Sequence, residues 1–214
     1  FMMVPAFVDW FYGNNDWPAF VGSSFITLFV GAVCFLSNRG IVTEHLELRQ
    51  AFLLTNSAWI SIALFGSLPF MFSQIDMSFT DAIFESTSGI TTTGATVLND
   101  IEILPKGILF WRSTTHWIGG MGIIVLAIAI LPFLGIGGIQ LFTAEAPGPA
   151  GDKLHPRITD TAKRLWLIYV VYTFLETLLL YFAGMSFFDA VNHAMSTVST
   201  GGFSTKNNSV AFWN

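Results

Sequence analysis

Charged residues are absent from three long stretches of this chain. Residues 17–38, 50–75 and 113–144 contain no Asp, Glu, Lys or Arg, and residues 165–184 contain only Glu176. Each stretch meets the requirement of about 20 predominantly apolar residues for a helix that crosses the hydrocarbon core of a bilayer. Residues 1–11 look like the end of a fifth such helix. The pattern predicts an all-α integral membrane protein rather than a soluble protein with buried helices.

Two polar segments interrupt this apolar pattern, and they are copies of each other. Residues 77–94 align without a gap with residues 185–202, at an offset of 108, and eight of the eighteen aligned residue types are identical. Both copies begin with the spacing of a capping box, in which a Ser starts a helix and an acidic residue follows three positions later. A helix of about a dozen residues then precedes the next glycine cluster, and it rises only about 18 Å. Each copy therefore predicts a short helix that enters the membrane and stops partway. The capping residues are Ser78 with Asp81 and Ser186 with Asp189.

Each short helix runs into a cluster of Thr, Ser and Gly, TTTGAT in the first copy and STGGFS in the second. Non-helical backbone at membrane depth is tolerated only where protein buries it or where it lines a water-filled cavity. Backbone carbonyls in such a loop, with the partially negative end of a helix dipole behind them, suit a dehydrated monovalent cation. The two copies thus predict two walls of one cation filter. A polar loop used only for helix packing is the alternative.

The basic residues predict how the chain is oriented. Six of the nine Lys and Arg residues fall in two connections on the same side of the predicted spans, at residues 37–50 and 144–164. Because connections rich in Lys and Arg stay in the cytoplasm, these two are predicted to be cytoplasmic and residues 76–106 to face the outer side. Trp111 and Trp117 lie near predicted outer boundaries, where interfacial tryptophans are common.

Residues 145–160 are rich in Pro, Gly and charge, and this composition predicts a cytoplasmic linker. The chain also stops soon after the second polar segment, so we expect it to be a fragment of a longer protein. It then divides into an N-terminal helix pair with a cytoplasmic loop (1–50), a first helix–loop–helix unit (51–144), the linker (145–160), and a second unit truncated after its polar loop (161–214).

The composition excludes several other classes of function. Charged residues make up 11% of the chain, against about 25% in soluble proteins. The net charge of -5 offers no basic face for nucleic acid. The single cysteine, Cys34, excludes a disulfide within the chain, and the four histidines lack a close metal-ligand spacing. An intramembrane enzyme built on Glu176, His116 or Asp189 would need a nucleophile–base pair, and none has a recognisable spacing.

Several uncommon residues in the apolar segments are predicted to have structural roles. Glu85 and His193 occupy equivalent positions in the two short helices and are expected to brace the loops. His116 lies near the end of a span and is expected to be structural. Glu176 is either a functional group or a side chain that hydrogen-bonds to a neighbouring helix. Two groups of glycines suit close helix packing, namely Gly119, Gly120 and Gly122, and Gly135, Gly137 and Gly138.

Four motifs resemble the TrkH family of Trk-type bacterial potassium-uptake proteins, in the wider superfamily with KtrB. They are DAIFESTSGITTTGATVL, WRSTTHWIGGMGIIVLAIAILP, GGIQLF and STGGFS, and the resemblance covers nearly the whole chain. It implies a fold like a potassium channel, with four helix–pore loop–helix repeats in one chain and two extra helices in front. Here residues 1–36 would be the extra helices, residues 51–141 the first repeat and residues 161–214 most of the second. The third and fourth repeats are absent from the sequence.

The resemblance also implies a function, which is potassium uptake across the bacterial inner membrane without enzymatic activity. In related plant transporters, Ser at the first filter glycine goes with sodium and Gly with potassium, so Gly94 points to potassium. The expected partners are membrane lipid, a second copy of the protein and a TrkA-like cytoplasmic nucleotide-binding subunit. No cofactor is expected, since K+ is the transported ion. The alternatives are a sodium or mixed monovalent cation transporter of the same superfamily and a non-conducting membrane scaffold. The filter residues carried over by position are Thr92, Thr93, Gly94 and Ala95 in the first loop, and Thr200, Gly201, Gly202 and Phe203 in the second.

Overall fold

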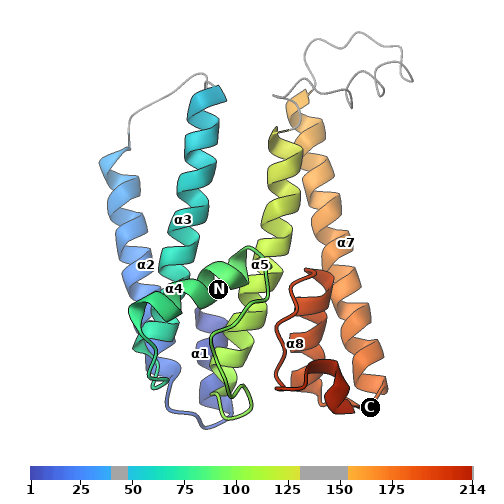
Figure 1. The fold of residues 1–214 in the computed structure, drawn as a ribbon. Helices are drawn as coiled ribbons and strands as arrows, with labels where there is room; N and C mark the ends of the chain where they lie inside the picture. Colours follow the sequence, from blue (N-terminus) through green and yellow to red (C-terminus); the bar gives the residue numbers. More distant parts are fainter. Residues whose placement is uncertain (40–47, 131–153, 214) are drawn as a thin grey trace, which may run out of the picture.

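The computed structural model describes residues 1–39, 48–130 and 154–213 of the 214-residue chain. Within these ranges the chain forms helices joined by turns and loops, and it contains no strand. Among the residues described, four long helices and four short ones make up the fold (Figure 1). In chain order they are α1 (Met3–Phe11), α2 (Trp17–Ser37), α3 (Leu48–Phe72), α4 (Phe79–Ile90), α5 (Lys106–Ile130), α7 (Leu154–Phe182), α8 (Phe187–Val198) and the 3-10 helix η1 (Ser209–Trp213).

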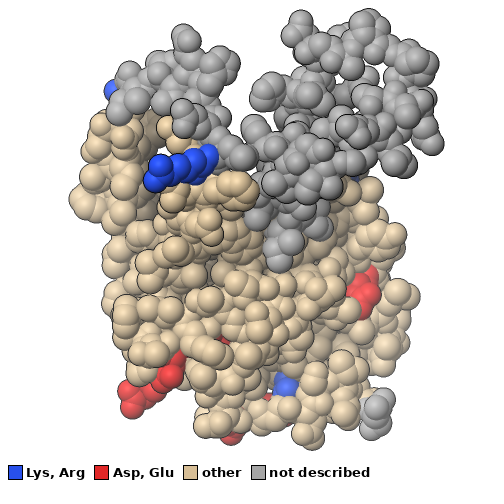
Figure 2. Space-filling view, turned by 45° about the horizontal axis from the view of Figure 1, so that its top comes forward, with Lys and Arg blue, Asp and Glu red and all other residues tan. Residues whose placement is uncertain are grey.

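Among the described residues, three helices are long and apolar enough to cross a membrane, at Trp17–Ser37, Phe52–Phe72 and Ala162–Phe182. Large apolar side chains along them are exposed, for example Phe29 at 70% and Phe182 at 80%. Uncharged residues cover most of the face drawn in Figure 2, and most charged side chains gather near its two ends. Over the described residues, the chain therefore matches the prediction of an all-helical fold with helices long and apolar enough to span a membrane. The remaining predicted span, at residues 113–144, corresponds to α5 as far as Ile130, and the rest of it lies outside the described residues.

Helix α5 begins at Lys106, seven residues before the start predicted from the charge-free run. The predicted span started at residue 113 because Arg112 is the last charged residue before the charge-free run. In the structure Arg112 is paired with Glu85 of α4, at 2.7 Å between Nε and Oε1, so the charge does not interrupt the helix. The helix instead starts directly after Pro105, a residue that favours helix starts because it has no N–H to satisfy.

Two other predicted boundaries differ from the structure. Helix α7 begins at Leu154, so the last part of the predicted linker at residues 145–160 is helical, and its first part lies outside the described residues. At the N-terminus, the segment read as the end of a spanning helix forms a separate helix of nine residues, α1, which a turn joins to α2.

The short helices α4 and α8 have twelve residues each and start in the same way. The Ser78 hydroxyl accepts a hydrogen bond from the Asp81 backbone N–H at 3.1 Å, and Ser186 accepts one from the Asp189 N–H at the same distance. Each hydroxyl also donates to the Asp carboxylate at 2.7 Å. Both predicted capping boxes are confirmed, and both helices end partway along their long neighbours (Figure 1).

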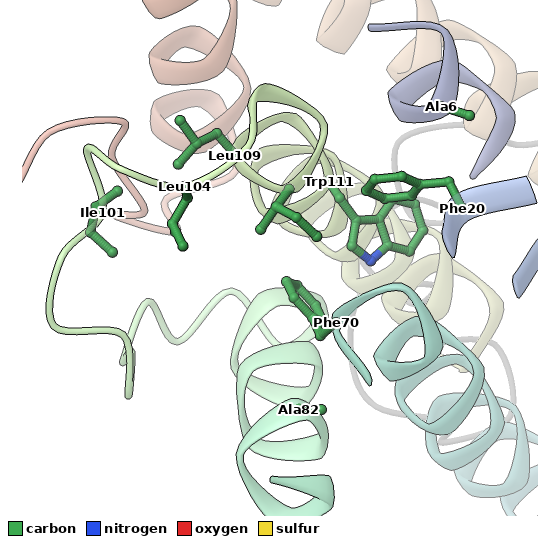
Figure 3. Close-up of a cluster of buried hydrophobic side chains, with 9 residues drawn as sticks. Ala6, Phe20, Phe70, Ala82, Ile101, Leu104, Leu109 and Trp111 are labelled. Atoms are coloured by element: carbon green, nitrogen blue, oxygen red, sulfur yellow. The ribbon is translucent and has the colours of Figure 1, made fainter. Parts of the chain in front are cut away.

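Buried apolar side chains from the first half of the chain form a compact cluster where α1 to α5 meet (Figure 3). Trp111 lies in this cluster and is only 4% exposed. Its indole Nε1 donates to the Gly66 carbonyl of α3 at 3.0 Å. The expectation of an interfacial tryptophan is wrong here, because the indole N–H has found a buried backbone partner and the ring can leave the surface. The cluster comprises Ala6, Phe20, Phe70, Ala82, Ile101, Leu104, Ile108, Leu109 and Trp111.

Asp9 of α1 is fully buried and caps the start of α5. Its Oδ1 accepts a hydrogen bond from the Gly107 backbone N–H at 2.5 Å and one from the Asn14 side chain at 3.1 Å. The first N–H groups of a helix lack intrahelical partners and carry partial positive charge, so a carboxylate there is stabilising. Contact with α1 thus completes the N-terminus of α5.

Cysteine labelling tests the predicted orientation. The end of α2 lies at the top of Figure 1, and the connection from α4 to α5 lies in its lower half. In the full-length protein carrying Cys34→Ala, we expect Asn99→Cys to react with an impermeant maleimide added from outside, and Asn38→Cys to be protected. Both positions are exposed on the described chain, so protection would report the membrane and not burial. The reverse labelling pattern would contradict the orientation.

Candidate functional site: two loops joined through one helix

The first polar loop follows α4 with a backbone that an ordinary strand or helix does not adopt. Thr92 has φ 55° and Gly94 has φ 78°, both in the left-handed region. The loop is held to the end of α4 because the Thr93 N–H donates to the Ser88 carbonyl at 3.0 Å. The Ser88 hydroxyl in turn donates to the Ala95 carbonyl at 2.6 Å. The chain therefore folds back along the helix that precedes it.

The second loop repeats this conformation at the same offset of 108 residues. Thr200 has φ 58° and Gly202 has φ 98°. The Gly201 N–H donates to the Ser196 carbonyl at 2.8 Å, and the Ser196 hydroxyl accepts from the Gly202 N–H at 3.0 Å. The second-loop residues Thr200, Gly201, Gly202 and Phe203 also line a cavity of about 300 Å³ together with η1. The sequence repeat is thus a repeat of backbone geometry.

The two loops meet each other directly. A Cβ built on Gly94 would overlap the carbonyl oxygen of Gly201 and lie 3.2 Å from its carbonyl carbon. A side chain at Gly94 therefore has no space, independently of its positive φ. The structure thus brings the predicted residues of both loops together. The two residues in contact, Gly94 and Gly201, do not occupy equivalent positions in the repeat.

Glu85 and His193 brace the two loops, as predicted from their equivalent positions in α4 and α8. The Thr96 hydroxyl donates to both carboxylate oxygens of Glu85, at 2.9 and 3.0 Å. His193 Nε2 lies 2.9 Å from the Ser204 hydroxyl, and Ser204 occupies the position equivalent to Thr96. In both units a side chain of the short helix thus hydrogen-bonds to the residue two positions after the loop glycine.

Arg112 of α5 is the residue that the sequence analysis missed. It is 2% exposed, and it contacts both units. Nε donates to Glu85 at 2.7 Å, a terminal nitrogen donates to the Thr96 hydroxyl at 3.1 Å, and the other donates to the Ser204 carbonyl at 3.3 Å. The sequence does contain a signal for it, since Glu85 lies in a segment predicted to enter the membrane, Arg112 directly precedes a predicted span, and opposite charges at such places need partners.

His116 lies one turn after Arg112 and contacts the second loop. Its ring stacks on Phe203 with centroids 4.0 Å apart and planes 14° apart, and Arg112 lies over the same ring at 4.1 Å. His116 Nδ1 is 3.1 Å from the Ser196 hydroxyl, and Gly201 packs so closely on the imidazole that a Cβ has no room. The structural role predicted for His116 is confirmed. Helix α5 of the first unit therefore holds the loop of the second.

Glu176 and the predicted packing glycines lie apart from these contacts. Glu176 is half-buried on α7, and among the described residues it has neither a hydrogen bond nor an ion pair. Gly119 packs against the backbone of Ile90, and Gly120 packs against Ser199, as close helix packing requires. The second glycine group, at residues 135–138, lies outside the described residues. Within the described ranges, no three His, Cys, Asp or Glu side chains are grouped as metal ligands.

Comparison with known proteins identifies relatives of the chain. The family described as TrkH, cation transport protein, matches residues 17–214. The Trk system potassium uptake protein TrkH of Salmonella typhimurium is 48% identical over 214 residues, which are 99% of this chain and 44% of that protein. The Trk system potassium uptake protein TrkG of Escherichia coli is 40% identical over 217 residues, covering 100% of this chain and 44% of the relative.

A solved structure agrees with the sequence relatives. The crystal structure of the potassium transporter TrkH from Vibrio parahaemolyticus superposes with a TM-score of 0.86 at 43% identity, over 99% of this chain and 42% of that one. The chain spans less than half the length of the relatives it matches. The match of the family to residues 17–214, with this level of identity along the chain, shows that the protein belongs to the TrkH family of cation transport proteins.

Proposed function

We propose that this chain forms two of the walls of a potassium uptake pathway in the bacterial inner membrane. Potassium would be selected by backbone carbonyls of the two loops, which replace the water around the ion. The contact between Gly94 and Gly201 carries this proposal, because it brings the backbones of two repeated loops together with no side chain between them. The residues proposed to face the ion are Thr92, Thr93, Gly94 and Ala95, and Thr200, Gly201, Gly202 and Phe203.

The loop conformation supports selection through the backbone. In an extended strand, successive residues point to opposite sides. Positive φ at Thr92 and Gly94, and again at Thr200 and Gly202, breaks this alternation and allows neighbouring carbonyls to face one side. None of the eight loop residues carries a charge, so a fixed side-chain charge is not the selecting group. Helices α4 and α8 end at the loops, and the partially negative ends of their dipoles favour a cation there.

The names of the relatives favour potassium as the cargo, since the proteins compared above are described as potassium uptake proteins or a potassium transporter. Gly at position 94, where Ser goes with sodium in related plant transporters, points the same way. A sodium or mixed monovalent cation transporter is the alternative within the family. K+ is the substrate, and no cofactor is needed for this mode of selection.

The chain supplies only part of the proposed pathway. It spans 44% of the relatives' length, so the remaining walls of the pathway would come from the rest of the full-length protein. By resemblance to the family, the full protein would form a homodimer in the lipid bilayer and bind a TrkA-like nucleotide-binding subunit on its cytoplasmic side. We therefore assign uptake to the complete protein.

Uptake in cells tests the proposal. The full-length protein is expected to restore growth at low external potassium to bacteria that lack their own potassium uptake systems, and to accumulate K+ in preference to Na+. Cells with the empty vector are the control. Equal accumulation of the two ions would favour the mixed-cation alternative. A protein that reaches the membrane and moves neither ion would be a non-conducting scaffold.

A further inference from the structure

Arg112 reaches equivalent positions of the two repeated loops at once. It donates to the Thr96 hydroxyl in the first unit and to the Ser204 carbonyl in the second. Thr96 and Ser204 are 108 residues apart, the offset of the repeat, and each follows its loop glycine by two positions. One side chain therefore links the same point of both loops.

The ion pair at the centre of the network around Arg112 is almost fully buried. Glu85, which receives the Nε donor, is 0% exposed, and Arg112 is 2% exposed. The Glu85 carboxylate also accepts from the Thr96 hydroxyl and from the Val97 N–H at 3.2 Å. A buried ion pair is tolerated when further hydrogen bonds satisfy its remaining donors and acceptors. The planar guanidinium donates from three separate nitrogens in a rigid fork and so reaches three acceptors that lie apart, whereas all the donors of a lysine ammonium sit on one nitrogen.

The second unit lacks a carboxylate at the corresponding place, since His193 stands where the first unit has Glu85. There the guanidinium contacts the Ser204 carbonyl and the face of the Phe203 ring instead. The second loop is thus tied to the first unit by a helix that belongs to that unit. The start of each loop is held by its own short helix, through Ser88 and Ser196. The far end of each loop is held by its short helix, through Glu85 or His193, and Arg112 is the side chain that contacts both far ends.

We propose that Arg112 is a positioning residue for ion selection, which sets the distance between the two loops without touching the ion. The proposal rests on the proposed function of the loops. Discrimination between K+ and Na+ by carbonyls depends on the size of the cage or on the number of carbonyls that reach the ion, and both change when one wall moves. Loss of the Arg112 contacts is therefore expected to lower selectivity, and not only the amount of folded protein.

Two variants of the full-length protein test this proposal. Arg112→Lys keeps the charge opposite Glu85 but lacks the fork of donors. The double variant Glu85→Gln/Arg112→Gln removes both charges together, so neither is left buried and unpaired. The matched control is Glu102→Gln/Lys206→Gln, which removes an ion pair that also joins the two units, at 3.7 Å, but with side chains 37% and 22% exposed. Uptake of K+ and of Na+ is measured into liposomes that contain equal amounts of protein.

We expect the K+/Na+ uptake ratio of Arg112→Lys and of the double variant to fall by about tenfold or more, which corresponds to about 1.4 kcal/mol. The control pair should keep the wild-type ratio, because exposed ion pairs contribute little. A wild-type ratio in Arg112→Lys or in the double variant overturns the role of Arg112 while leaving the proposed function intact. A wild-type protein that does not prefer K+ overturns the proposed function, and the positioning role with it.

Discussion

A serine in place of Gly94 is expected to weaken the discrimination of potassium against sodium in the full-length protein by about tenfold or more. Two independent features of the structure lead to this expectation. Gly94 has φ 78°, a conformation in which a side chain adds strain of about 1–3 kcal/mol. The Cβ would also overlap the Gly201 carbonyl oxygen of the other loop, so one of the two walls has to move. Potassium and sodium uptake, measured side by side in the same preparation, report the change.

Gly13→Ser is the matched control for Gly94→Ser. Gly13 has φ 73°, close to that of Gly94, but a Cβ there meets nothing within 4 Å, and the residue lies in the turn between α1 and α2. Gly13→Ser adds the conformational strain but does not disturb the contact between the loops. The K+/Na+ uptake ratio of this variant should therefore stay at the wild-type value. If Gly94→Ser leaves the K+/Na+ uptake ratio unchanged while Glu176→Gln abolishes the preference for potassium, the ion is selected elsewhere and the assignment of the loops is wrong.

Gly119→Ala is expected to be the most destabilising small substitution in α5. A Cβ at Gly119 would overlap the carbonyl oxygen of Ile90 and lie 2.7 Å from the Ile90 carbonyl carbon and 3.1 Å from its Cα. These are backbone atoms at the end of α4, so no side-chain rotation relieves the contact. Either α5 moves away from α4 or the start of the first loop is displaced. Overpacking of this kind costs about 3 kcal/mol in the free energy of unfolding. Thermal unfolding of the purified full-length protein in detergent should therefore show a lower Tm for Gly119→Ala than for the wild type.

Gly31→Ala provides the comparison in a neighbouring span. Gly31 lies in α2, and a Cβ there meets nothing within 4 Å. Alanine is a better helix former than glycine by about 1 kcal/mol, so the Tm should hold or rise slightly. Equal melting temperatures for Gly119→Ala and Gly31→Ala would show that α4 and α5 are not packed as described.

The elements that depend on local sequence could be predicted, and the contacts between units could not. Ser78 and Ser186 cap their helices through a residue three positions away, so the pattern contains the whole interaction. The meeting of Gly94 with Gly201 is different, because the repeat aligns Gly94 with Gly202 and says nothing about how two copies pack. A repeat in the sequence identifies equivalent residues, but it does not identify the contact between the two copies, which here joins the non-equivalent residues Gly94 and Gly201.

Arg112 and Trp111 were misjudged for a related reason. Both were interpreted from residue type and distance along the chain, as the boundary of a span and as an interfacial ring. Each is buried because a partner on another helix satisfies its polar group, Glu85 for the guanidinium and the Gly66 carbonyl for the indole N–H. The predicted start of α5 was therefore seven residues too late, since the charge of Arg112 is paired within the helix. Opposite charges in separate segments at membrane depth indicate such a pair, although they do not identify its other hydrogen-bond partners.

The cap that Asp9 places on α5 has a consequence for the biogenesis of the protein. The two residues of the hydrogen bond, Asp9 and Gly107, are 98 positions apart. A chain leaves the ribosome from its N-terminus, so the carboxylate is made well before the helix whose first N–H groups it receives. Until Gly107 has been made, the Asp9 carboxylate lacks this backbone partner. The docking of α1 onto the later helix is then a late assembly step, because a nascent chain that ends before Gly107 has the Asp9 carboxylate but not the helix that it caps.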